Sequence, residues 1–227
     1  MFGEISDRYD LLNRLLSAGT DVAWRNLAVR EALRPSDRRV VDLACGTGDL
    51  ALALRRKAHP ACTVVGMDFT APMLRIAQRK GARNPAGSVH WVEGDGLRLP
   101  LPSGSVDLVT IAFGIRNMES LEGALREIHR VLRPGGRLAV LEFSRPGNKL
   151  VETLYYPYFL HVLPRLGALI SNRSAYLYLP QSVLHFPGRR ELARIMKREG
   201  FGRVRHCALS FGIAALHIGD KLPERPS

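Results

Sequence analysis

The chain has 227 residues, of which 46% are hydrophobic and 24% are charged, and its formal net charge at pH 7 is +12. This length suits one well-buried core, so we predict that residues 1–227 form a single domain. Charges at Glu4, Asp7 and Arg8 exclude a secretory signal peptide, and we expect a cytoplasmic protein. The three cysteines lack C-x-x-C spacing, so we predict buried thiols and no metal site.

The basic residues are spread along the whole sequence without a long block. This dispersal fits either a surface rich in salt bridges or contact with an anionic membrane surface. Because no basic module or interleaved aromatic pattern is present, we predict no nucleic-acid partner. Among functional roles we favour peripheral contact with the inner face of the membrane, and a homodimer stays open.

Residues 2–16 carry apolar side chains at helical spacing, which predicts an amphipathic helix. A second helix is predicted over residues 21–33, before a proline. Together they make an N-terminal helical cap, residues 1–35. This cap either covers a cofactor cleft or packs on the sheet, and the pattern alone does not separate the two.

Residues 40–43, with the sequence VVDL, predict a strand that runs into a glycine turn and then a helix. Gly46 and Gly48 allow a ligand to approach the backbone closely, and the helix start presents free N–H groups to it. The spacing fits both dinucleotide enzymes and S-adenosylmethionine enzymes.

Carboxylates decide between these two cofactors. Four of them fall at or just after predicted strand ends, where open α/β sheets bind ligands. Such a cluster repels a pyrophosphate and attracts a sulfonium and an ammonium group, so it favours S-adenosylmethionine. The four residues are Asp42, Asp49, Asp68 and Asp95.

The predicted strand 63–68 ends at Asp68, whose carboxylate is placed to accept hydrogen bonds from a ribose diol. Phe69 either covers the adenine or belongs to the core. A short strand over residues 89–92 leads to Asp95, which is a candidate acceptor for the adenine amino group.

An apolar run over residues 106–113 predicts a central parallel strand. Arg116 and Asn117 follow at its carboxyl end, where they face the ligand crevice. We predict that Arg116 stabilises developing negative charge and that Asn117 orients the substrate. A surface arginine beside a helix-capping asparagine is the equally open alternative.

The rest of the chain alternates between helices and strands. An apolar, aromatic insertion over residues 148–180 is expected to wall a greasy pocket, to touch a membrane or to form a buried helix pair. Helices are predicted over 71–80, 119–133 and 186–199, a fifth strand over 137–143, and a hairpin over 204–209 and 213–218.

The chain resembles the ubiquinone/menaquinone C-methyltransferases, the UbiE/COQ5 group, over nearly its whole length. The resemblance rests on VVDLACGTGDLA, GMDFTAPMLRIA, FGIRN, LEFSRP and GIAALHIGDK. It implies an α/β class I S-adenosylmethionine-dependent methyltransferase fold, with a Rossmann-like, mostly parallel seven-stranded sheet and a C-terminal antiparallel hairpin. It also implies C-methylation of a polyprenylated quinol, with demethylmenaquinol favoured and 2-polyprenyl-6-methoxy-1,4-benzoquinol as a further substrate.

The resemblance also implies roles for single residues. Tyr9, Arg116 and Asn117 are expected to line the quinol site. The expected cofactor residues, from both the residue patterns and the resemblance, are Asp42, Gly46, Thr47, Gly48, Asp68, Phe69, Asp95 and Gly96. At Ala112 the family commonly has a serine, so one hydroxyl contact is absent. Gly96 replaces a small alanine, which leaves a backbone contact intact.

Two alternatives stay open at this point. One is a class I methyltransferase that acts on another lipid or on a soluble small molecule. The other is a cofactor-binding accessory subunit of a quinone-synthesis complex with little activity of its own.

Overall fold

The computed structural model describes residues 19–84, 86–146, 153 and 182–223. The predicted helix 2–16, which includes Tyr9, and nearly all of the insertion 148–180 lie outside these described residues.

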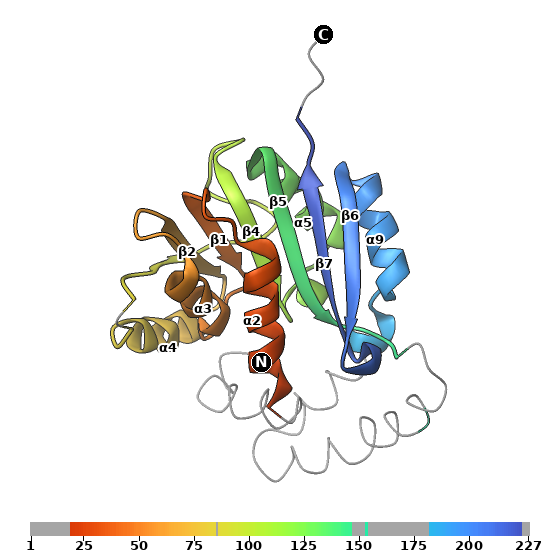
Figure 1. Cartoon of the computed structure of the whole chain (residues 1–227), viewed down its shortest axis with the longest axis horizontal. Helices are drawn as coiled ribbons and strands as arrows, with labels where there is room; N and C mark the ends of the chain where they lie inside the picture. The colour runs from red at the N-terminus through yellow and green to blue at the C-terminus, as the bar shows by residue number, and fades with distance from the viewer. Residues whose placement is uncertain (1–18, 85, 147–152, 154–181, 224–227) are drawn as a thin grey trace.

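Within the described ranges, seven strands form one sheet in the order β3-β2-β1-β4-β5-β7-β6 (Figure 1). The first five strands are parallel, and β7 pairs antiparallel with both β5 and β6. The predicted α/β sheet with a C-terminal antiparallel hairpin is therefore confirmed. The strands are β1 Arg39–Leu43, β2 Thr63–Asp68, β3 His90–Glu93, β4 Val106–Ala112, β5 Leu132–Phe143, β6 Phe201–Leu209 and β7 Ala214–Lys221.

Helices cover both faces of the sheet (Figure 1). One face carries α2 (Thr20–Ala32), α3 (Asp49–Lys57) and α4 (Ala71–Gly81), and the other carries α5 (Leu121–Val131) and α9 (Arg189–Arg198). Short 3-10 turns follow β4 and β6, namely η2 (Ile115–Asn117) and η4 (Ser210–Gly212). No helix in the described part of the chain is long and apolar enough to cross a bilayer.

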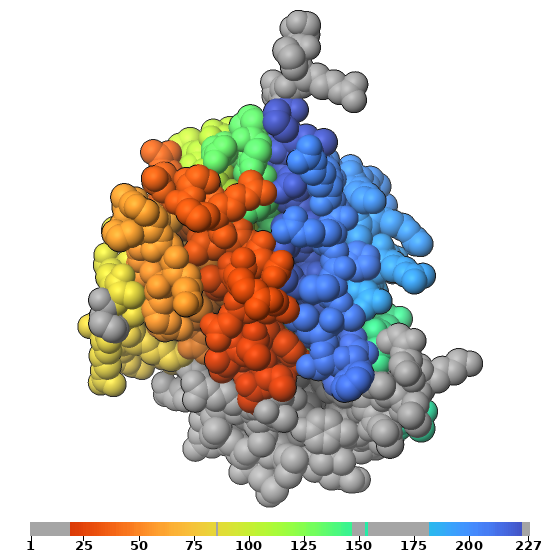
Figure 2. Space-filling view, in the orientation of Figure 1, coloured from red at the N-terminus to blue at the C-terminus, as the bar shows by residue number. Residues whose placement is uncertain are grey.

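Two apolar clusters fill the space between the helices and the sheet. Side chains alternate between the two faces along a strand, so Val40 packs with α2 and α3 while Val41 packs with α5 and α9. Burial on both faces explains why the central strands read as almost continuous apolar runs. Trp24 and Ala28 bury the inner side of α2, which covers the middle of its face (Figure 2). This second helix of the predicted cap therefore packs on the sheet.

The boundary between α5 and β5 differs from the prediction. The helix begins after Ser120, whose Oγ accepts a hydrogen bond from the N–H of Gly123 at 3.0 Å. It ends at Val131, so the predicted helix 119–133 is too long at both ends. The strand then begins at once, five residues earlier than the predicted start at residue 137.

A bulge in β5 accounts for this early start. Val106 of β4 pairs with Leu132, whereas Leu108 pairs with Arg137, so β5 advances five residues while β4 advances two. The three extra residues contain the Pro-Gly-Gly segment that we interpreted as the helix stop. A Cβ on Gly136 would lie 2.8 Å from the carbonyl oxygen of Arg133, which leaves room only for glycine.

The edge strand β6 overturns the prediction for the cysteines. Cys62 is buried and Cys45 is half-buried, but Cys207 is exposed near the end of β6. The side chains of residues 205–208 are all exposed, since β6 is the edge strand of the sheet. The thiol of Cys207 is therefore open to solvent.

A buried ion pair ties β5 to the segment before β1. The guanidinium of Arg137 donates to both carboxylate oxygens of Asp37, and its Nε donates to the carbonyl oxygen of Ala32 at the end of α2. Both charged side chains are only 1% exposed. The pair lies at the amino ends of the parallel strands, away from the edge where ligands bind in such sheets.

We predict that Asp37→Ala lowers the free energy of unfolding by about 3 to 5 kcal/mol, because it leaves the buried Arg137 charge without a partner. Urea unfolding followed by circular dichroism measures this loss. The matched control is Glu122→Ala, which removes an exposed ion pair with Arg198 at 3.2 Å and should cost about 1 kcal/mol or less. Equal losses for the two variants would contradict the prediction.

Candidate active site

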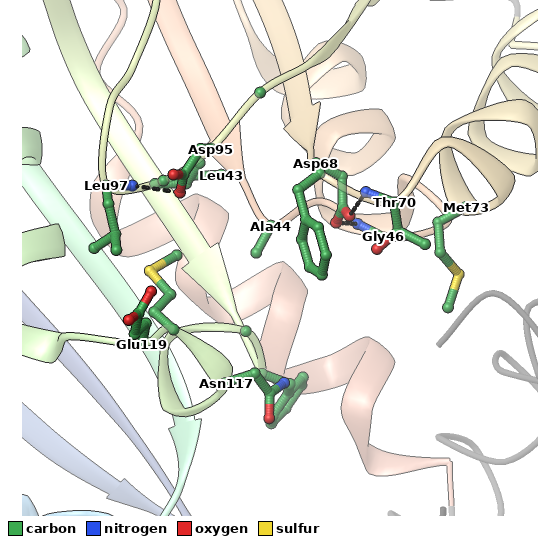
Figure 3. Close-up of a pocket in the computed structure, with 16 residues that line it drawn as sticks. Leu43, Ala44, Gly46, Asp68, Thr70, Met73, Asp95, Leu97, Asn117 and Glu119 are labelled. Atoms are coloured by element: carbon green, nitrogen blue, oxygen red, sulfur yellow. Dashed lines mark hydrogen bonds between the residues drawn. The ribbon is translucent and has the colours of Figure 1, made fainter. Parts of the chain in front are cut away.

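A cavity of about 400 Å³ opens at the carboxyl ends of β1, β2 and β4 (Figure 3). Its size falls in the range of small-molecule sites, and it lies where the strand order reverses between β1 and β4. Asp68 at the end of β2, Asp95 after β3 and Asn117 at the end of η2 border it (Figure 3). The other predicted site residues in its wall are Gly46, Phe69 and Gly96.

Asp68 joins two walls of this cavity. Its Oδ2 accepts the backbone N–H of Gly46 at 2.8 Å, and its Oδ1 accepts the N–H of Thr70 at 2.8 Å (Figure 3). A carboxylate has about four acceptor positions, so two remain for hydroxyl groups of a ligand. The carboxylate therefore both shapes the glycine turn and stays available to a diol.

The glycine turn after β1 depends on left-handed backbone conformations. Gly46 has φ +54° and Gly48 has φ +86°, values that favour glycine. A Cβ on Gly48 would also lie 2.5 Å from the ring of Trp91. Gly48 is the N-cap residue of α3, so its role here is to start the helix, while Gly46 borders the cavity.

Asp42 and Thr47 do not border the large cavity. They line a separate cavity of about 20 Å³, with Arg25 and Ala112. This volume holds about one water molecule. Ala112 is the position at which the expected serine hydroxyl is absent.

Asp42 is a buried carboxyl group. Its Oδ1 accepts a hydrogen bond from the hydroxyl of Thr110 at 2.8 Å, and its Oδ2 has no hydrogen-bond partner within the described ranges. Burial raises the pKa of Asp42 to about 7, although the Thr110 hydrogen bond and the charge of Arg25 act in the opposite direction. The group thus ionises near neutral pH, and a cation nearby would favour its charged form.

Thr47 is held by a lysine. Its hydroxyl accepts a hydrogen bond from Nζ of Lys80 at 3.1 Å, and the same ammonium donates to Oδ1 of Asp49 at 2.6 Å. These contacts join the start of α3 to the end of α4. Thr47 is itself buried, with 3% of its surface exposed.

The two remaining cofactor candidates from the sequence differ in exposure. Phe69 is 69% exposed, so the cavity side of its ring is free to cover a flat ligand, and the core alternative is wrong. Asp95 is also exposed, and its Oδ1 accepts the N–H of Leu97 at 2.9 Å (Figure 3).

Arg116 lies next to the cavity and faces another hollow. It lines a groove of about 510 Å³, whose walls include Ile115 and Phe186, and Met118 borders both the groove and the cavity. Nη1 of Arg116 donates to the carbonyl oxygen of Phe113 at 2.6 Å and to Oε1 of Glu142 at 2.6 Å. The side chain of Arg116 is only 6% exposed, so the alternative that it is a surface arginine is wrong.

Sequence reasoning missed several residues of the site. Phe113, Gly114 and Met118 line the cavity, and a Cβ on Gly114 would lie 2.5 Å from the Cβ of Ala44. This close approach brings the turns after β1 and β4 together. Phe113 and Gly114 belong to the FGIRN motif, and Glu142 belongs to LEFSRP. The motifs therefore pointed to these residues, but no local pattern in the sequence indicated what each of them does.

Comparisons with known protein sequences all point to one methyltransferase family. The sequence matches the model of the ubiE/COQ5 methyltransferase family over residues 1–221. It is 53% identical to the demethylmenaquinone methyltransferase of Thermus thermophilus over 222 residues, which cover 97% of this chain and 100% of that protein. It is 44% identical to the ubiquinone/menaquinone biosynthesis C-methyltransferase UbiE of Geobacter sulfurreducens, over 97% of this chain and 87% of that protein.

Solved structures share the fold. A SAM-dependent methyltransferase of Thermotoga maritima, described as a possible histamine N-methyltransferase, is similar with a TM-score of 0.70. The match covers 97% of each chain at 21% identity, a level that speaks for the fold alone.

We predict that Asp42 makes the ligand-free protein less stable as the pH rises. Its pKa in the folded state is about 7, above the ordinary value of 3.8, so the folded state holds a proton that the unfolded state has lost. The stabilisation is present below about pH 4 and is lost as the pH rises through about 7. Asp42→Asn removes this loss, which amounts to about 4 kcal/mol at most.

Urea unfolding of both proteins at a series of pH values checks this prediction. The difference in unfolding free energy between Asp42→Asn and the parent should grow with pH in favour of the variant. Parallel curves across the whole range would show that Asp42 titrates as it does in the unfolded chain.

Proposed function

The chain belongs to the ubiE/COQ5 methyltransferase family, and from this premise we propose that it methylates a ring carbon of a polyprenylated quinol. Demethylmenaquinol is the favoured substrate, in keeping with the name of the Thermus relative, and the benzoquinol of ubiquinone synthesis is the second. The cavity where Asp68, Asp95 and Asn117 converge is the observation that carries the proposal.

The residues of this cavity fit S-adenosylmethionine as the methyl donor. Asp68 offers acceptor positions to the ribose diol, Asp95 to the adenine amino group, and the exposed Phe69 a flat apolar surface to the adenine. Asp42, with its unpartnered buried oxygen, supplies negative potential beside the Gly46 turn for the positive charges of the methionine part. When bound, the cofactor supplies an electrophilic methyl group.

The protein must then activate a weak carbon nucleophile. A phenol has a pKa of about 10, and its ring carbon becomes reactive once the hydroxyl loses a proton. We propose that Arg116 stabilises the phenolate, with a water molecule relaying the proton, and that Asn117 orients the ring. Tyr9, outside the described residues, is proposed to complete this site.

The apolar walls of the groove and cavity support this role. Ile115 and Phe186 flank Arg116, and Met118 links the groove to the cofactor cavity. Such walls exclude water and favour an apolar quinol, and positioning of the reacting atoms at about 3 to 3.5 Å is worth several kcal/mol.

The experiment that tests the function offers labelled S-adenosylmethionine with demethylmenaquinol and with the benzoquinol precursor, in detergent under reducing conditions. Methylated product from either quinol supports the proposal and identifies the preferred substrate. Cofactor binding without product from either quinol would move the function to another lipid substrate or to an accessory role.

We predict that Asp68→Ala weakens S-adenosylmethionine binding at least about 10-fold, because it removes a charged acceptor and frees the Gly46 turn. Isothermal titration calorimetry measures the dissociation constant. The matched control is Asp107→Ala, because Asp107 also accepts two backbone N–H groups, those of Arg38 and Arg39 at 2.9 and 2.8 Å, but at the amino edge of the sheet. Unchanged binding in Asp68→Ala would contradict the assigned role.

We propose in addition that the carboxyl edge of the sheet contacts a membrane surface. Phe211, in the turn after β6, is 82% exposed, and both it and Ser210 adopt positive φ values, of 60° and 44°. Such strain in non-glycine residues is costly and is typical of functional sites. Trp24 donates a hydrogen bond to the hydroxyl of Ser210 at 3.1 Å, which holds this turn against α2.

Other exposed residues at the same edge fit a lipid surface. Because β6 points in the same direction as the parallel strands, Phe211 lies at the cavity edge. Arg145, after β5, and Arg190, at the start of α9, are exposed there too. An exposed aromatic ring with neighbouring arginines suits a surface of anionic lipids, in which a polyprenylated substrate resides.

We predict that Phe211→Ser lowers the partition coefficient onto phosphatidylglycerol vesicles by about 10-fold or more. The substitution removes the aromatic ring that we expect to insert into the lipid surface. Co-sedimentation measures the bound fraction. Leu222→Ser is the control, because Leu222 is 46% exposed but follows β7 at the opposite edge. Equal binding of the parent and Phe211→Ser would rule out this contact.

A further inference from the structure

The pair formed by Arg116 and Glu142 joins the turn after β4 to the end of β5. Glu142 is 1% exposed, and its Oε1 accepts Nη1 of Arg116 at 2.6 Å and its neighbour's backbone N–H, that of Phe143, at 2.8 Å. The guanidinium carbon of Arg116 lies 5.5 Å from the centre of the Phe143 ring. The ion pair with Glu142, the hydrogen bond from Nη1 to the carbonyl oxygen of Phe113 and the Phe143 ring therefore hold one end of the guanidinium in place.

The other end of the guanidinium is unused. A guanidinium has five N–H donors, and the two on Nη1 serve Phe113 and Glu142. Nε is buried without a hydrogen-bond partner among the described residues, and the structure shows no partner there for Nη2. Three donors of Arg116 are thus left for an acceptor that the described protein does not supply.

Glu142 also has an unused hydrogen-bonding atom, in this case an acceptor. Its Oε2 is buried and has no donor within the described part of the chain. Burial raises the pKa of Glu142, although the charge of Arg116 acts against this shift. Placing two charges in the interior is costly, and their attraction compensates only when the remaining polar atoms are also satisfied.

The buried pair at the other edge of the sheet shows the contrast. Nε of Arg137 donates to Ala32, and both of its terminal nitrogens donate to Asp37. That pair uses the whole fork of the guanidinium within the protein, as a structural ion pair should. The Arg116–Glu142 pair uses only one nitrogen, and it lies beside the substrate groove.

We propose that Glu142 is a positioning residue for methyl transfer, which holds Arg116 by Nη1 so that the donors of Nη2 point to the quinol oxygen. This inference rests on the proposed quinol methylation. Glu142 acts through Arg116, because its own carboxylate is too buried to reach a substrate in the groove. The ion pair thereby fixes the direction of a long side chain before the substrate binds, which reduces the ordering needed in the transition state.

The test compares Glu142→Gln, Arg116→Ala and the double variant in the full chain with its quinol substrate. Glutamine keeps the shape and the acceptor for Phe143 but removes the charge that orients Arg116. We expect kcat to fall about 100-fold in Glu142→Gln, with KM for S-adenosylmethionine nearly unchanged. In the Arg116→Ala background, the same substitution should cause no further loss, since the two residues act as one unit.

The matched control is Glu199→Gln, which alters a glutamate that is 10% exposed and pairs with Arg126 at 3.0 Å at the far end of α9. Its kcat should stay at the parental value. If Glu142→Gln does not fold, Glu142→Asp keeps the charge but withdraws it by one methylene, and the same loss of kcat is expected.

The outcomes distinguish the proposed role of Arg116 from the proposed role of Glu142. Full turnover in Arg116→Ala would overturn the proposed role of Arg116 and with it this inference. Impaired Arg116→Ala with a fully active Glu142→Gln would overturn the inference alone. Independent, multiplicative losses in the double variant would also overturn it, because they would assign Glu142 a structural role separate from Arg116.

Discussion

Two backbone N–H groups from different loops, those of Gly46 and Thr70, converge on the carboxylate of Asp68. This interaction holds the glycine turn after β1 at a fixed distance from the start of α4, and the cavity between them takes its shape from it. The turn after β4 closes the third side, where Gly114 permits close contact with Ala44. The site therefore depends on three strand ends that meet at one edge, as parallel strands require.

Buried charges lie at both edges of the sheet. At the amino edge, Arg137 and Asp37 form a buried ion pair, and we expect this pair to stabilise the fold. At the carboxyl edge, Asp42, Arg116 and Glu142 all keep buried polar atoms without a partner among the described residues. Unsatisfied buried groups cost free energy, and these three lie near the carboxyl ends of β1, β4 and β5, at the edge where we propose that the ligands bind.

Local patterns predicted most of the architecture, because strand and helix periods and turn residues are properties of short segments. The apolar run over residues 106–113 became β4, and the carboxylate after the second strand, Asp68, lies in the cavity. The end of α5 was predicted wrongly for a non-local reason. The Pro-Gly-Gly segment lies in a bulge that exists only because Leu132 already pairs with Val106 of β4.

The sequence by itself determined the order of strands and helices, the glycine turn and the edge of the sheet at which the acidic and polar candidates gather. Only the tertiary structure decided what each candidate touches. Thr47 bonds to Lys80, 33 residues away, and Arg116 pairs with Glu142, 26 residues away. Such contacts depend on how distant segments pack and which polar atoms remain unsatisfied, and no local period in the chain records this information.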